Sequence, residues 1–125
     1  MPPTSSTLRL QPQLDAPRQA RHLLQQTCAH LEPAVRADAC LILTEIVTNA
    51  LVHARTMITV AIECGDTAVA VAVTDNSSQL PLPEHPDDLQ ESGRGLLLID
   101  RLATAWGYDT SSDGQGKVIW FRIDC

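Results

Sequence analysis

The sequence predicts an α+β fold, a two-layer α/β sandwich in which helices cover one face of a mixed, mostly antiparallel sheet. Three observations support this fold class. The chain has 125 residues and a hydrophobic content of 44%, which suit one compact domain with its own core. Predicted strands come in neighbouring pairs rather than singly between helices, and two helices follow one another without a strand between them. The predicted order is strand, helix, helix, strand, strand, long loop, helix, strand, strand.

The N-terminal part of the chain is predicted to contain a short strand and two helices. Residues 1–6 are rich in Pro, Ser and Thr and are expected to be disordered, whereas residues 7–11 alternate weakly, as a short edge strand does. An amphipathic helix begins near Asp15, because apolar residues then recur at helical spacing. Pro33 is placed to begin a second helix, and residues 37–54 continue without Gly or Pro for about five turns.

The rest of the chain is predicted to contain two pairs of strands separated by a loop and a helix. Residues 57–63 and 67–74 alternate in character on either side of a Gly65-Asp66 turn, which predicts a hairpin. Residues 76–92 are rich in Pro, Ser and acidic residues, and so long a connection is typical of a lid, a binding loop or a disordered segment. The last elements are a helix and two strands, at residues 93–105, 106–110 and 117–124.

Charge and cysteine content limit the expected partners and compartment. The formal net charge is −6 and the basic residues are scattered along the chain, so neither nucleic acid nor a membrane is an expected partner. The four cysteines include no C-x-x-C pair, and no basic leader followed by an apolar run occurs near the N-terminus. A cytoplasmic protein with reduced thiols and no metal cluster is therefore expected. Three histidines without companions at metal-ligand spacing are interpreted as surface residues: His22, His30 and His85.

The stretch LTEIVTNALVHA, residues 43–54, sets Glu45, Asn49 and His53 four residues apart. On an α-helix such positions form one slowly drifting stripe, and the other side chains of this stretch are almost all apolar. Two interpretations stay open on the pattern alone. One is a solvent-facing strip. The other is a pocket wall, in which the carboxylate polarises water or orients a metal-bound group and the amide carbonyl binds a hard cation such as Mg²⁺.

Two further motifs are candidates for a binding site. Asp75 follows the alternating run AVAVAVT at the end of a predicted central strand, where a carboxylate is either a turn residue or an acceptor for an exocyclic amine such as that of adenine. Gly93-Arg94-Gly95-Leu96 precedes an apolar helix. This arrangement is typical of a loop-to-helix junction and also of a helix start that binds phosphate. It is neither the dinucleotide fingerprint nor a Walker A loop.

In this order the motifs resemble those of the small ATP-binding domains of the anti-sigma-factor serine kinases. These domains belong to the wider family that includes histidine kinase ATPase domains, gyrase B and Hsp90. TEIVTNALVHA is similar to the N box of that family, VTDNSS to its first glycine box, SGRGLLLIDRLATAWG to its second, and GKVIWFRI to its closing strand. The resemblance covers about Leu8 to Ile123. It implies one domain of the Bergerat-type ATP-binding fold over residues 1–125, with residues 76–92 as the ATP lid.

The resemblance also implies a role for each matching residue. Glu45 aligns with the catalytic acidic residue that prepares the nucleophile or a water, and Asn49 with the amide ligand of Mg²⁺. His53 is implied to lie near the phosphates on the same helix, and Asp75 to accept the amino group of adenine. The other implied nucleotide-binding residues are Gly93, Arg94, Gly95 and Leu96. The implied cofactors are ATP and Mg²⁺.

The function implied by the resemblance is regulatory. Such a kinase phosphorylates a serine on an antagonist protein, and it sequesters a sigma factor when the antagonist is absent. The implied partners are therefore a sigma factor and an anti-sigma-factor antagonist. A second copy of the chain, in a homodimer, is a further option.

Two departures from the family pattern support an alternative. Ser77 and Gln79 stand where the first glycine box usually has glycines, and Val118 stands where the closing strand often has a threonine near the adenine. One lost hydrogen bond costs only about 1 kcal/mol. Together the departures favour weaker ATP binding than is typical of the family. The alternative is a non-catalytic protein-interaction module of the same fold.

Overall fold

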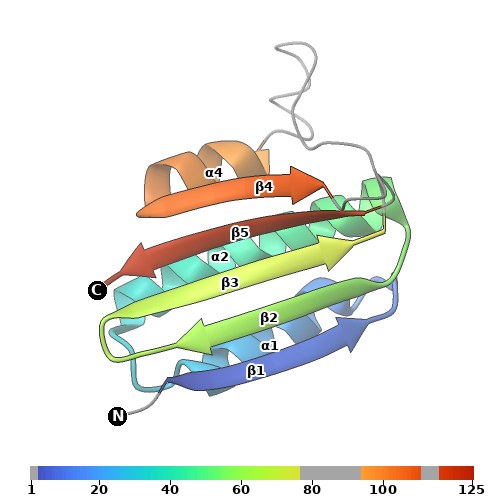
Figure 1. Cartoon of the computed structure of the whole chain (residues 1–125). Coiled ribbons are helices and arrows are strands. Elements are labelled where there is room, and N and C mark those ends of the chain that lie inside the picture. The colour runs from blue at the N-terminus through green and yellow to red at the C-terminus, as the bar shows by residue number, and fades with distance from the viewer. Residues whose placement is uncertain (1–2, 77–93, 111–115) are drawn as a thin grey trace.

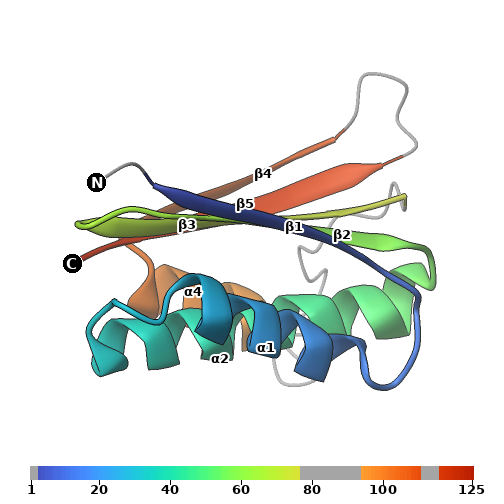
Figure 2. The same ribbon diagram turned by 90° about the horizontal axis from the view of Figure 1, so that it is seen from below.

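The computed structural model describes residues 3–76, 94–110 and 116–125. Within them, five strands form one sheet in the order β1-β2-β3-β5-β4, and the helices cover one of its faces (Figure 1 and Figure 2). The strands are β1 (Thr4–Leu10), β2 (Ile58–Cys64), β3 (Ala68–Asp75), β4 (Ala105–Thr110) and β5 (Lys117–Asp124). The helices are α1 (Ala16–Thr27), α2 (Pro33–Asn49), the π-helical turn η1 (Ala50–Ala54) and α4 (Arg94–Leu102). None of these described helices is long and apolar enough to cross a membrane.

The predicted α+β class and the two-layer arrangement are confirmed. All four strand pairings in the described sheet are antiparallel, where a mixed, mostly antiparallel sheet was expected. The path of α4 explains the difference, because this helix returns the chain to the end of the sheet at which β3 began (Figure 1). Strand β4 therefore points the same way as β3, and β5, inserted between them, is antiparallel to both.

Strand β1 begins at Thr4, earlier than the expected start and inside the stretch expected to be disordered. Its backbone pairs with β2 from Thr4 opposite Cys64 to Leu10 opposite Ile58. The exposed polar residues at the start of β1 are thus ordered by the backbone hydrogen bonds of the ladder rather than by side-chain burial. As predicted, β1 is an edge strand.

Apolar side chains at alternate positions of the central strands fill the layer between the sheet and the helices. The inward-facing apolar positions of β2, β3 and β5 are buried: Ile58, Val60, Ile62, Val69, Val71, Val73, Ile119, Phe121 and Ile123. Helices α1 and α2 contribute Ala20, Leu24, Ile42, Leu43, Ile46 and Val47 from the other side. Because both layers bury apolar side chains against each other, the hydrophobic effect holds the sheet and the helices together.

The four cysteines are free thiols, of which Cys125 is exposed and the other three are buried. Desolvation by burial raises the pKa of the Cys28 and Cys40 thiols. These two thiols therefore remain protonated and unreactive at neutral pH.

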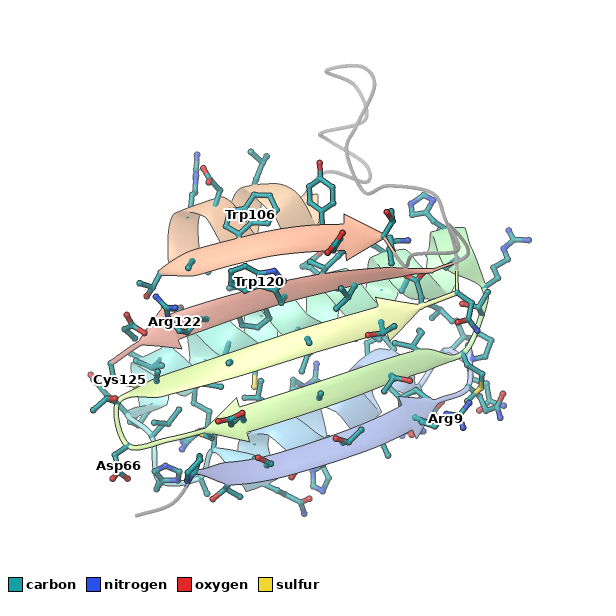
Figure 3. The ribbon with its side chains drawn as sticks, viewed as in Figure 1. Arg9, Asp66, Trp106, Trp120, Arg122 and Cys125 are labelled. Atoms are coloured by element: carbon teal, nitrogen blue, oxygen red, sulfur yellow. The ribbon has the colours of Figure 1, made fainter. Side chains whose placement is uncertain are left out.

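Gly107 on β4 lies directly opposite Trp120 on β5, and Trp120 extends over the sheet face that no described helix covers (Figure 3). A Cβ atom at Gly107 would approach the Trp120 indole to 2.9 Å. We expect Gly107→Ala to displace the indole and to lower the free energy of unfolding by about 1 kcal/mol, measured by urea denaturation and tryptophan fluorescence. In a Trp120→Thr background the same change should be close to neutral. An equal loss in both backgrounds would contradict the contact.

Candidate functional site

Several of the predicted site residues lie at the end of the sheet where β3 ends and β5 begins. Helix α2 runs into η1 toward this same end (Figure 1), and α2 contacts both β3 and β5. The backbone N–H of Asn76, directly after β3, donates to the hydroxyl oxygen of Thr56, just after η1, at 3.0 Å. This hydrogen bond joins the end of the helix to the end of the strand.

Helix α2 carries two of the predicted site residues, Glu45 and Asn49. Pro33 occupies its first turn, where the fixed φ of proline suits a helix start. Glu45 and Asn49 lie one turn apart beside the buried apolar face, and both are half-buried. Asn49 also takes part in an interaction within the chain. The two side chains thus lie at the margin of the core and are neither fully solvated nor fully buried.

The helix changes its hydrogen-bonding pattern directly after Asn49. The backbone N–H of Arg55 donates to the carbonyl of Ala50, five residues earlier, at 3.1 Å, and Arg55 adopts a left-handed conformation with φ of 56°. The α-helix is therefore shorter than expected and ends in a π-helical turn. His53 lies in this turn and is exposed. π-helical turns of this kind are frequent at functional sites.

Asp75, the last residue of β3, forms a buried ion pair. It continues the inward-facing series of Val71 and Val73 and is 3% exposed, so its carboxylate points into the layer between the sheet and the helices. Lys117, which is 8% exposed, begins β5 directly opposite Asp75. Its ammonium nitrogen lies 3.0 Å from Oδ2 and 3.3 Å from Oδ1 of the carboxylate.

The sequence analysis missed Lys117 as the partner of Asp75. The sequence analysis expected Val118 near the adenine, whereas the register pairs Val118 with Thr74 and pairs Lys117 with Asp75. Side chains alternate between the two faces of a strand, so Val118 points to the opposite face of the sheet from Asp75. A signal was available: Lys117 is in phase with the buried Phe121, and it is the only lysine of the chain.

The remaining predicted residues lie in α4 or outside the described part of the chain. The first three residues of α4 are Arg94, Gly95 and Leu96. Gly93 and the lid residues 77–92, with Ser77 and Gln79 among them, are outside the residues that the structure describes. Of the histidines predicted at the surface, His22 and His30 are exposed, and His85 is outside the described residues.

The oxygen donors on α2 suit a hard cation that takes most of its ligands from elsewhere. Mg²⁺ is usually bound through one or two protein groups, with phosphates and waters completing an octahedron. The Glu45 carboxylate and the Asn49 amide are groups of this type at a half-buried position. Within residues 3–76, 94–110 and 116–125, no group of three or more His, Cys, Asp or Glu side chains could hold a metal ion.

The family of the chain follows from a comparison with known protein families. Residues 10–123 match the family described as the histidine kinase-like ATPase domain, and the chain belongs to this family. The resemblance to histidine kinase ATPase domains is thereby confirmed, and the match extends from the end of β1 almost to the end of β5. A comparison with curated proteins gives no match.

Proposed function

We propose that the chain binds ATP with Mg²⁺ at the end of the sheet where α2, β3 and β5 meet. Asn49 ligates Mg²⁺, Glu45 prepares the attacking group, and Asp75 recognises the amino group of adenine. One observation carries the proposal: Asp75 is buried at the end of β3, and the helix that contacts this strand presents Glu45 and Asn49 half-buried. Membership of the ATPase-domain family supports the same ligand.

We further propose that the chain is an anti-sigma-factor serine/threonine kinase, acting in the cytoplasm on an antagonist protein and sequestering a sigma factor. In the transfer step a serine oxygen of the antagonist attacks the γ-phosphorus, and the bond from that phosphorus to the β,γ-bridging oxygen breaks. ADP leaves, and Glu45 accepts the serine proton. The spacing of Glu45 one helical turn before Asn49 supports these roles, because side chains four residues apart lie on the same side of a helix.

Isothermal titration calorimetry with Mg-ATP tests the binding proposal. We expect saturable heat in the wild type and an affinity about tenfold lower in Asn49→Ala, which loses a ligand to a charged group. Gln26→Ala, which removes an exposed amide from α1, is the matched control and should bind as the wild type does. The absence of heat and of a thermal shift at millimolar nucleotide would contradict ATP binding.

A second candidate function is favoured by the buried Asp75–Lys117 ion pair. Because the carboxylate proposed to recognise adenine already has a charged partner, the same fold can act as a protein-interaction module without nucleotide. Capture of a sigma factor with and without ATP separates the two functions. If the amount of captured sigma factor changes neither with ATP nor with Asn49→Ala, the result supports the interaction module. Phosphorylation of the antagonist supports the kinase.

A further inference from the structure

The buried ion pair contains Lys117, the only lysine of the chain. This lysine lies where the proposed site would bind adenine. Every other basic residue is an arginine. Lysine is rarely buried unless it is paired, and Lys117 is 8% exposed. Its position at the start of β5 is set by the strand register, which places it opposite Asp75 and in phase with the core residues Ile119 and Phe121. The pair is therefore a consequence of how β3 and β5 align.

Lys117 contacts both oxygens of the Asp75 carboxylate. The Lys117 ammonium lies within 3.3 Å of both carboxylate oxygens, and Asp75 has a further interaction within the chain. An ammonium is a charged donor, and its hydrogen bond to a carboxylate is about twice as strong as a neutral one. An adenine amino group is a neutral donor. It would therefore have to compete with Lys117 for the same oxygen atoms.

We propose that Lys117 competes with adenine for the Asp75 carboxylate. In the ligand-free protein Lys117 occupies this carboxylate, and it thereby limits the affinity for ATP. This inference rests on the proposed function, because it assigns Asp75 to the recognition of adenine. ATP binds when the Lys117 ammonium moves off the carboxylate, and the four-carbon side chain of lysine gives it the freedom to do so. The identity of residue 117 thus sets how tightly this site holds ATP.

Calorimetric titration of Mg-ATP into residue-117 variants tests the competition. Lys117→Thr removes the competing charge, and we expect it to bind Mg-ATP about tenfold more tightly than the wild type. Its melting temperature without nucleotide should fall, because Asp75 is then buried without the counter-charge of Lys117, and the rise produced by ATP should be larger than in the wild type. Lys117→Arg keeps the charge and should bind ATP no more tightly than the wild type.

Arg122→Thr provides the matched control on the same strand. Arg122 forms an ion pair with Asp124 at 3.0 Å, but the two side chains are 47% and 50% exposed, and Arg122 lies on the uncovered sheet face (Figure 3). This variant should bind Mg-ATP as the wild type does. Equal tightening in Lys117→Thr and Arg122→Thr would show a general effect of net charge and would overturn the proposal.

The wild-type protein allows a test that depends on no variant. With ¹⁵N-labelled lysine, the single side-chain Nζ signal reports only on Lys117. We expect saturating Mg-ATP to shift this signal as the ammonium leaves Asp75. If backbone signals show that ATP is bound while the Nζ signal stays unchanged, the competition is overturned.

The outcomes separate this inference from the proposed function. If the wild type binds Mg-ATP and Lys117→Thr binds it no more tightly, the inference fails and ATP binding stands. If neither the wild type nor Lys117→Thr binds Mg-ATP, the proposed function fails and the inference falls with it.

Discussion

Asp75→Ala is expected to lower the free energy of unfolding by about 3–5 kcal/mol, because it leaves the Lys117 ammonium buried without a counter-charge. The size of the effect follows from burial, since the paired side chains are 8% and 4% exposed. Urea denaturation measures it directly. Asp124→Ala is the matched control: it breaks a half-exposed ion pair with Arg122, and such surface pairs contribute at most about 1 kcal/mol.

A double variant separates the cost of a lone charge from the value of the pair. Replacing Asp75 and Lys117 together by leucine removes both charges from the buried layer, and the product is expected to be at least as stable as the wild type. The double variant should also lose Mg-ATP binding, since no carboxylate remains to accept a hydrogen bond from the adenine amino group. A loss below about 1 kcal/mol for Asp75→Ala alone, the range of a surface pair, would contradict a buried ion pair.

Glu45→Ala is expected to reduce phosphoryl transfer by about 100-fold or more while leaving Mg-ATP affinity close to that of the wild type. The expectation follows from the proposed division of roles on α2, in which Asn49 would hold the metal and Glu45 would take the proton of the attacking hydroxyl. Transfer is measured as labelled γ-phosphate appearing on a serine of an anti-sigma-factor antagonist. Calorimetry on the same sample measures nucleotide affinity.

Glu63→Ala is the control for this change, because Glu63 is an exposed glutamate on β2 and should keep full transfer activity. Transfer by Glu45→Ala at the wild-type rate would rule out Glu45 as the base. If the wild type binds ATP but phosphorylates no serine on any antagonist, the non-catalytic module becomes the better account.

The sheet is the part of the fold that the sequence predicts best. The strand predicted at residues 117–124 is confirmed without change, because Ile119, Phe121 and Ile123 alternate with outward-facing side chains along its whole length. The hairpin of β2 and β3 is confirmed to within a residue at each end for the same reason. Period-two alternation is a local signal, and it survives folding because one face of each strand must be buried.

The site could be predicted only in part. Asp75 was identifiable because it extends the inward series of β3, and Glu45 and Asn49 because of their spacing on an apolar helix. The π-helical turn that contains His53 has no comparable local signal. The partner of Asp75 depends on the register between β3 and β5, two strands more than 40 residues apart, and a shift of one residue exchanges Lys117 for Val118.

The central claim is that Mg-ATP binds where α2, β3 and β5 meet, and backbone amide chemical shifts on addition of Mg-ATP test it most directly. We expect the shifts to change around Asn49 and His53 on the helix and around Asp75 and Lys117 on the strands, and to be smaller in Asn49→Ala. Changes centred instead on the uncovered sheet face around Trp120, or no changes at saturating nucleotide in either the wild type or Lys117→Thr, would contradict the claim.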